Sequence, residues 1–326
     1  MNPFQYSRAG TVGEAVVQVS NDPAAAFLAG GTTQIDLMKE DVLHPSRLID
    51  INDLPLARIV VKAGGGVMIG AMVRNSDLAH SALIRESYPV LSEALLSGAS
   101  AQLRNMATTA GNLMQRTRCP YFRDTATPCN KRVPGSGCPA REGYNRTHAI
   151  FGASEQCVAV HPSDMCVAMA ALDAIVHTRG PRGARAIPIA EFHRLPGSHP
   201  EQDTILQHGE LITEVELPAS QFAGRSHYVK VRDRASYAFA LVSAAVALHI
   251  EGNTIRAARV VLGSVAHKPW RSEAAEAVLI GAPATGTTFA AAGEAAVRDA
   301  QVLTHNAYKV ALARNAVIRA LTDVSA

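Results

Sequence analysis

Four cysteines lie in one stretch of the chain that carries no ordinary folding signals. They are Cys119, Cys129, Cys138 and Cys157, out of five cysteines among 326 residues. Between Arg116 and Cys157 the apolar periodicity of helices and strands is missing, and proline, glycine and arginine are frequent. Such a composition cannot bury an apolar face unaided. A segment of roughly 40 residues without a core of its own needs a cross-link, and cysteine thiols can form one by binding a metal or by pairing in disulfides.

Several kinds of cross-link are compatible with these cysteines, and each predicts different chemistry. Structural zinc sites usually present Cys-x2-4-Cys pairs, and none of the four is so paired, which disfavours zinc. A [4Fe-4S] cluster accepts ligands from widely separated turns, whereas disulfides require an oxidising compartment. Spacing alone leaves a cluster, disulfides and free thiols open. The fifth cysteine, Cys166, lies in an apolar run and is expected to be a small buried helix residue.

Two segments rich in glycine and hydroxyls have the composition of anion sites. The first, Ala29-Gly30-Gly31-Thr32-Thr33-Gln34, follows an expected strand. Adjacent glycines let consecutive backbone N–H groups point at one anion, as a pyrophosphate requires, although a glycine pair is also typical of a purely structural turn. The second, Thr108-Thr109-Ala110-Gly111-Asn112, offers the same chemistry. Two such segments on neighbouring units predict a dinucleotide held from both sides. Gly64 to Gly66, in an expected hairpin, lacks the strand-turn-helix context of a Rossmann site.

The elements that would position the first segment form a compact α/β unit. Apolar residues at helical spacing predict a helix over Thr11 to Ser20, and Gln34 to Lys39 can open another. Strands are expected to end at Leu28 and to cover Arg47 to Ile51.

Further elements are predicted along the rest of the chain. Pro89 to Gly98 indicates a helix, followed by a second small-residue loop that carries Thr108 to Asn112. The apolar run Met165 to Ile175 restarts regular structure, with Ser163 or Asp164 suited to cap a helix. The remaining expectations are a hairpin of strands 59–61 and 67–69, strands over 228–234, 241–250 and 255–262, and helices near 272–280, 288–299 and 305–321.

Composition excludes several classes of protein. Hydrophobic residues make up 48% and charged residues 18%, which is typical of a folded globular chain. A balance of 31 basic and 28 acidic residues is too even for a nucleic-acid binder. No apolar stretch approaches the roughly 20 residues that span a bilayer. Met1 to Gly10 has no features of a Sec signal, so export would need a signal on a partner.

The motifs occur in the order of a known family, which the chain resembles over nearly its whole length. This family comprises the FAD-binding middle subunits of the xanthine dehydrogenase and carbon monoxide dehydrogenase group of molybdenum hydroxylases. The motifs that carry the resemblance are Leu28-Ala29-Gly30-Gly31-Thr32, Arg104-Asn105-x-Ala107-Thr108-Thr109-Ala110-Gly111-Asn112, His161-Pro162-Ser163-Asp164, Gly209-Glu210-Leu211-Ile212, Leu217-Pro218 and Lys230 to Ala240. One departure is Ala110, where the family commonly has glycine. Alanine there asks for a negative φ and leaves the Thr109 and Gly111 donors intact.

The resemblance implies an α+β fold in two domains. Residues 1–222 would form a two-part FAD-binding domain of the molybdenum hydroxylase flavoprotein (PCMH-like) type, with subdomains of about 1–55 and 56–222. Residues 223–326 would form a C-terminal α/β domain with a small antiparallel sheet and helices, similar to the CO dehydrogenase flavoprotein. The cysteine-rich stretch, about 116–158, is an insertion. It resembles the one in the flavin subunit of bacterial periplasmic aldehyde oxidoreductases, where four cysteines hold a [4Fe-4S] cluster.

The resemblance also implies the cofactors and their sites. FAD would bind non-covalently, with its pyrophosphate on Ala29 to Gln34 and on the second segment, where Thr108, Thr109, Gly111 and Asn112 would contact it. Leu28 would also belong to the cofactor site. Asp164 and Lys230 would contact the ribityl chain or the ring. On the residues alone, Asp164 could equally cap a helix and Lys230 could be a solvated strand residue. Cys119, Cys129, Cys138 and Cys157 would hold the [4Fe-4S] cluster.

The implied function is electron transfer. A large partner with the molybdenum cofactor would oxidise an aldehyde, [2Fe-2S] clusters of a small partner would pass electrons on, and FAD here would deliver them to an external acceptor, so the chain itself needs no nucleophile or general base. Alternatives are the flavin subunit of a 4-hydroxybenzoyl-CoA reductase-like or xanthine dehydrogenase-like complex, or a non-redox scaffold stapled by zinc or disulfides. We expect a periplasmic complex, co-exported on a partner's signal, or a cytoplasmic one without that signal.

Overall fold

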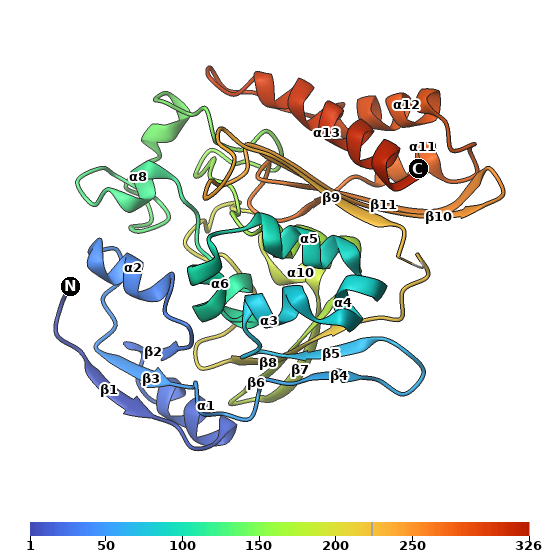
Figure 1. Ribbon diagram of the computed structural model, residues 1–326. Helices are drawn as coiled ribbons and strands as arrows, with labels where there is room; N and C mark the ends of the chain where they lie inside the picture. Colours follow the sequence, from blue (N-terminus) through green and yellow to red (C-terminus); the bar gives the residue numbers. More distant parts are fainter. Residues whose placement is uncertain (223, 326) are drawn as a thin grey trace.

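The fold is built on three sheets, each with its own helices. The computed structural model describes residues 1–222 and 224–325. Figure 1 shows a small N-terminal unit, a larger central unit and a C-terminal unit whose helices lie at the opposite end of the molecule from the N-terminal strands. The mixture of helices with mainly antiparallel sheets confirms the expected α+β class. Among the helices of the described residues, none is both long and apolar enough to cross a bilayer.

The N-terminal unit presents the first glycine segment at a strand end, as predicted. Its parallel sheet has the order β1-β3-β2, formed by β1 (Gln5–Arg8), β2 (Ala25–Leu28) and β3 (Arg47–Asp50). Helix α1 (Val12–Ser20) begins after Thr11, whose hydroxyl accepts the N–H of Glu14, and buries its apolar face on the sheet. The first segment leaves β2 and enters α2 (Gln34–Lys39).

The central unit packs helices against a five-stranded antiparallel sheet of order β4-β5-β8-β6-β7. Its strands are β4 (Ile59–Val61), β5 (Val67–Gly70), β6 (Ile175–Gly180), β7 (Gly183–Pro188) and β8 (Leu211–Leu217). Its helices are α3 (Asn75–His80), α4 (Ala82–Ser87), α5 (Pro89–Ser97), α6 (Ala101–Met106), α7 (Thr109–Leu113), α9 (Asp164–Ala171) and α10 (Ile189–Phe192). Every residue of α9 is buried, because the helix lies between this unit and the C-terminal sheet.

One expectation for this unit was wrong. The segment around Thr108 to Asn112 is not an open loop, because α6 and α7 occupy most of it and Thr108 is the N-cap of α7. These helices have six and five residues, too short for a periodic pattern to be visible. The cap predicted at Ser163 or Asp164 is confirmed, and of the two residues it is Ser163. The Ser163 hydroxyl accepts the N–H of Cys166, and Asp164 is the first helical residue.

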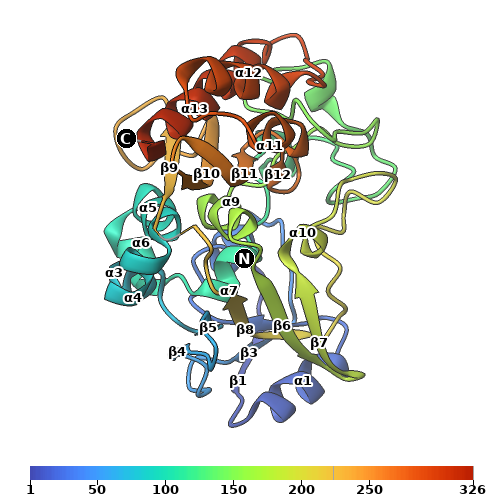
Figure 2. The same ribbon diagram turned by 90° about the vertical axis from the view of Figure 1, so that its right-hand side faces the viewer.

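The cysteine-rich segment contains little regular structure, as its composition indicated. Only α8 (Pro120–Arg123) and one turn of 3-10 helix (Pro139–Arg141) interrupt it in the described residues. Figure 2 shows this segment at the edge of the molecule, beside the C-terminal unit.

The C-terminal unit has an antiparallel sheet of order β12-β11-β10-β9. It consists of β9 (Ser226–Val231), β10 (Val242–Glu251), β11 (Thr254–Gly263) and β12 (Trp270–Arg271), with α11 (Glu273–Leu279), α12 (Gly286–Val297) and α13 (Tyr308–Ser325). α13 packs on β9 and β10 from one side, while α5 and α9 of the central unit pack on the sheet from the other. Because both faces are covered, β10 is an almost continuous apolar run.

Candidate functional site

Two adjoining cavities cross the molecule between its three units. One, of about 560 Å³, lies between the N-terminal and central units and is lined by Ala29 to Gln34 together with Thr108 and Gly111. The other, of about 630 Å³, lies between the central unit, the insertion and the C-terminal unit. Thr32, Thr33 and Gly111 line both. An elongated ligand with bulky groups at its ends and a polar middle would therefore have its middle beside the two glycine segments.

Most of the predicted binding residues line these cavities. The first cavity brings together Ala29, Gly30, Gly31, Thr32, Thr33, Gln34, Thr108 and Gly111, and the second adds Asn112, Asp164 and Lys230. Leu28 and Thr109 line neither. The Thr109 hydroxyl is buried and donates to the carbonyl of Val73 at 3.1 Å, so its contact holds α7 on the central unit.

The first glycine segment packs directly against the end of α6. A Cβ atom on Gly30 would lie 2.0 Å from the carbonyl oxygen of Met106, so no side chain fits there. Gly31 has φ +72, a backbone conformation that favours glycine. Close backbone approach thus brings the two glycine segments together on the cavity wall.

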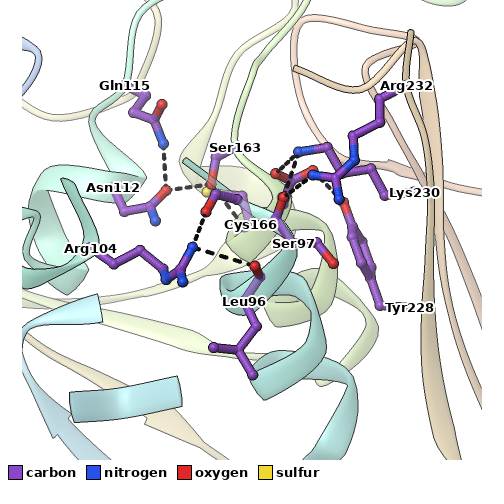
Figure 3. Close-up of polar contacts among 12 residues, drawn as sticks. Leu96, Ser97, Arg104, Asn112, Gln115, Ser163, Cys166, Tyr228, Lys230 and Arg232 are labelled. Atoms are coloured by element: carbon purple, nitrogen blue, oxygen red, sulfur yellow. Dashed lines mark hydrogen bonds and ion pairs between the residues drawn. The ribbon is translucent and has the colours of Figure 1, made fainter. Parts of the chain in front are cut away.

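In the second segment, the Gly111 N–H and the Thr108 hydroxyl, which were expected to face the ligand, bond to each other instead. The N–H of Gly111 donates to the Thr108 hydroxyl at 3.1 Å, which caps α7. Asn112 remains directed at the second cavity, where its Oδ1 accepts from Ser163 at 2.6 Å and from Gln115 at 2.6 Å. Figure 3 shows this chain of contacts from Gln115 through Asn112 to Ser163. It joins the second segment to the start of α9.

A buried ion pair forms one wall of the second cavity. Lys230 Nζ lies 2.8 Å from Asp164 Oδ2, and the two side chains are only 3% and 9% exposed. Asp164 Oδ1 accepts from the Tyr228 hydroxyl at 2.7 Å, and Lys230 also donates to the carbonyl of Ser97 at 3.0 Å. Lys230, Tyr228 and Ser97 lie side by side in Figure 3. Lys230 is therefore not a solvated strand residue, because α5 packs on that face of β9 and Asp164, at the start of α9, pairs with the Lys230 side chain.

Two arginines on the second cavity keep unsatisfied polar atoms. Within the described residues, Nε of Arg104 and Nε of Arg118 are buried without a hydrogen-bond partner. Arg104 is fixed by a 2.7 Å bond to the Gly98 carbonyl, and the guanidinium of Arg118 stacks on Phe239. Buried donors of this kind are normally satisfied, so a polar ligand in the cavity fits them.

Sequence reasoning missed several residues of the second cavity, which come from the segment between β9 and β10. Tyr237 and Phe239 line it and are half exposed, and Tyr237 has a positive φ of 51. Arg234 donates to the carbonyl of Tyr237. The motif Lys230 to Ala240 contains these residues, but only the docking of the C-terminal unit shows that they reach the cavity.

All four clustered cysteines line one small cavity inside the insertion. None of them is in a disulfide. The backbone N–H of Phe122 donates to the carbonyl of Cys119 at 3.1 Å, which closes the first turn of α8 after this cysteine. Burial raises the pKa of Cys119 to about 12, and the Cys157 thiol, which donates to Cys138, lowers the pKa of Cys138. Mostly neutral thiols gathered in this way would be deprotonated by a bound metal.

The spacing of the sulfurs bears on which metal fits. Tetrahedral zinc, with Zn–S bonds of about 2.3 Å, would hold its sulfurs about 3.8 Å apart. Within the described residues, the one group of three or more ligand atoms that all lie within 4.8 Å of each other is His161, Cys166 and His193, not the four cysteines. The wider set suits a cluster that spreads over several metal ions.

The group formed by His161, Cys166 and His193 is buried beneath α7 and α9. Cys166 is a fully buried helix residue, as predicted. His193 Nε2 is 2.9 Å from the carbonyl of Leu113, to which it can only donate, and His161 Nδ1 accepts the N–H of Ser163 at 3.4 Å. Burial lowers the pKa of His193 to about 4. Both histidines are therefore uncharged packing residues.

The cysteine cavity and the larger cavity share a wall. Cys119 and Thr117 line both, and His148 lines the larger one while its Nε2 lies 3.1 Å from the sulfur of Cys119. A redox group on the cysteines would therefore be next to a ligand in the larger cavity.

The fold combines a two-part α/β domain with a separate C-terminal sheet, and two adjoining cavities between them could take an extended dinucleotide. This combination is that of a class of flavoprotein. Residues 2–220 match the family model described as the FAD binding domain in molybdopterin dehydrogenase, and residues 226–324 match the CO dehydrogenase flavoprotein C-terminal domain. The chain belongs to the FAD-binding medium subunits of the molybdenum hydroxylase family, and is thus an oxidoreductase subunit.

Individual relatives agree along the whole chain. The chain is 52% identical to the aldehyde oxidoreductase FAD-binding subunit PaoB of Escherichia coli K12, covering 100% of this chain and 99% of that protein. It is 29% identical to the carbon monoxide dehydrogenase medium chain of Hydrogenophaga pseudoflava, covering 98% and 96%. The solved structure of carbon monoxide dehydrogenase from Hydrogenophaga pseudoflava superposes with a TM-score of 0.77 at 28% identity, covering 99% of this chain and 98% of that one.

Proposed function

We propose that this chain is the FAD- and [4Fe-4S]-binding electron-transfer subunit of a molybdenum-dependent aldehyde oxidoreductase. The observation that carries the proposal is the common wall of the two cavities, to which the cysteine ligand Cys119 contributes. Electron transfer requires two redox groups close together, and this wall supports that arrangement. The similarity to a protein named as an aldehyde oxidoreductase subunit, at 52% identity, supports the substrate class.

FAD fits the pair of cavities as an extended dinucleotide. When bound, it supplies a group that accepts and donates electrons, and the protein supplies its position and surroundings. Thr32 and Thr33 lie where the cavities meet, and their hydroxyls, with the adjacent Gly30 and Gly31 on the first cavity, would hold the pyrophosphate. Asp164 and Lys230 would contact the part of the ligand in the second cavity.

The insertion supplies the second redox group. Cys119, Cys129, Cys138 and Cys157 would ligate the cluster from four separate turns of the segment. Buried Lys131 lies on the wall of the same small cavity and donates to the carbonyl of Pro200 at 2.6 Å. Its positive charge would stabilise the negative charge of a ligated cluster.

Electrons would reach this chain from partner subunits. A large subunit with the molybdenum cofactor would oxidise the aldehyde, and a small subunit with [2Fe-2S] clusters would pass electrons to FAD here, which delivers them to an external acceptor. The relatives with medium chains of carbon monoxide dehydrogenase support a complex of this kind. Export to the periplasm on a signal carried by a partner completes the proposal.

Cofactor analysis of the co-purified complex tests the proposal. The native complex should release FAD on denaturation, and a Cys129→Ser variant should lose about four irons, as cubane ligation requires. Cys166→Ala is the matched control, because this buried cysteine lies outside the cysteine cavity and should leave the iron unchanged. Absence of flavin, or zinc in place of iron in the native complex, would contradict the proposal and favour a non-redox scaffold.

A further inference from the structure

Two histidines each contact one of the clustered cysteine sulfurs. His148 Nε2 lies 3.1 Å from Cys119 Sγ, and His267 Nε2 lies 3.3 Å from Cys157 Sγ. Both rings are buried. The sequence motifs include neither residue.

The backbone around His148 is held rigidly by the C-terminal helix. Its carbonyl oxygen accepts from Lys309 Nζ at 2.9 Å and from Asn306 Nδ2 at 3.3 Å. Lys309 and Asn306 are completely buried. Asn145 fixes the same segment a turn earlier, since its Oδ1 accepts the N–H of His305 at 2.9 Å. These contacts leave the imidazole of His148 between Cys119 and the larger cavity.

The geometry determines which partner must donate when the cysteines are ligands. A cysteine sulfur bound to iron carries no proton, so it can only accept. Each imidazole Nε2 must then donate its N–H to the sulfur. The other ring nitrogen, Nδ1, is buried without a partner in both residues within the described part of the chain, so nothing there competes for the proton on Nε2.

We propose that His148 and His267 are positioning residues that raise the reduction potential of the cluster by donating hydrogen bonds to Cys119 and Cys157. This inference rests on the proposed function, because it requires the cluster. Reduction adds negative charge to the ligand sulfurs, and an N–H donor stabilises that charge more than the charge of the oxidised form. Hydrogen bonds to the sulfurs are among the factors that set cluster potentials.

A redox titration of the co-purified complex, followed by the electron paramagnetic resonance of the reduced cluster, tests the inference. His148→Leu and His267→Leu should each lower the midpoint potential, with a tenfold change in the one-electron equilibrium, 59 mV, as the expected scale. His148→Gln keeps an N–H donor near the position of Nε2 and should restore most of the shift. His177→Leu is the control, because His177 bonds Glu216 on β8 and contacts no cysteine.

Iron analysis on the same samples separates the outcomes. A native complex whose iron does not exceed that of the partner's [2Fe-2S] clusters would overturn the proposed function itself. Leucine variants with full iron and an unchanged midpoint would overturn only the role of the histidines. If one leucine variant loses the iron of the cluster, the midpoint potential of the other variant tests the role of the histidines. Loss of iron from both, with the glutamine variant behaving like leucine, would also overturn potential tuning and assign the histidines a structural role.

Discussion

Lys230→Met should destabilise the chain strongly, because it leaves Asp164 as an unpaired buried carboxylate. At 2.8 Å and an effective dielectric constant near 20, the gross attraction within the pair is about 6 kcal/mol. The cost of removing two charges from water offsets most of that attraction, so the pair itself adds little net stability. Removing one partner is different, because the remaining charge keeps its cost. We expect a loss of about 3–5 kcal/mol in the free energy of unfolding.

Urea unfolding of the purified chain, with FAD titration in parallel, measures this effect. The pair joins α9 of the central unit to β9 of the C-terminal unit, so the variant should weaken their association as well as FAD binding at the second cavity. The double variant Lys230→Met with Asp164→Leu removes both charges and should recover much of the stability. Arg314→Met is the control, because its ion pair with Glu294 is exposed and should contribute less than about 1 kcal/mol.

The reasoning is refuted if Lys230→Met unfolds at the urea concentration of the native chain. It is also refuted if the double variant loses, relative to the native chain, the full sum of the losses of Lys230→Met and Asp164→Leu. Either result would mean that Asp164 is not an uncompensated charge in the absence of Lys230. The Tyr228 hydroxyl, which also donates to Asp164, would then be a sufficient partner.

Two further predictions concern the glycine contact and the C-terminal helix. Gly30→Ala should destabilise the chain by about 1–3 kcal/mol and abolish FAD binding in a flavin titration, because its Cβ would collide with the Met106 carbonyl; Gly13→Ala, where nothing lies within 4 Å, should leave FAD binding intact. Burial lowers the pKa of Lys309 from 10.5 to about 7, so between these values the unfolded chain binds more protons than the folded one and stability should rise with pH. Urea unfolding at several pH values should show that rise in the native chain and a shallower one in Lys309→Met; equal slopes would contradict it.

Local elements were predictable from the sequence because their signals are local. The bounds of α2 match the predicted Gln34 to Lys39, and α1 covers the predicted Thr11 to Ser20 except Thr11, which is its cap. The failures have a common cause, which is that distant segments decide the outcome. In the sequence, Lys230 has the appearance of a solvated strand residue, since nothing in the neighbouring residues indicates that α5 covers that face of β9. Its partner Asp164 is 66 residues away.

The site was predictable in outline for the same reason. The glycine segments and the four cysteines are visible as motifs, and they line the cavities in the structure. The occupied hydroxyls of Thr108 and Thr109 were not predictable, because their contacts depend on the short helix α7 and its docking on Val73. Nothing in the sequence singles out His148 and His267, because their contacts with Cys119 and Cys157 join residues 29 and 110 positions apart.

The insertion shows how a segment without an apolar core can still be placed precisely. Lys131, almost fully buried, contacts Asp203 at 2.5 Å, and Arg116 contacts the same carboxylate at 2.7 Å. Burial alone would raise the pKa of Asp203, but the two positive charges outweigh it and lower this pKa to about 2. The carboxylate therefore stays ionised above that pH. At the other end, Lys309 and Asn306 hold the backbone of His148. Polar contacts from both domains, together with Ile150 and Phe151, which pack in the apolar core of the C-terminal unit, therefore fix the cysteines against the larger cavity. Because electron transfer between two redox groups depends on their separation, such anchoring is what a cluster-bearing insertion would need, whereas a staple for stability alone would not require contacts with both domains.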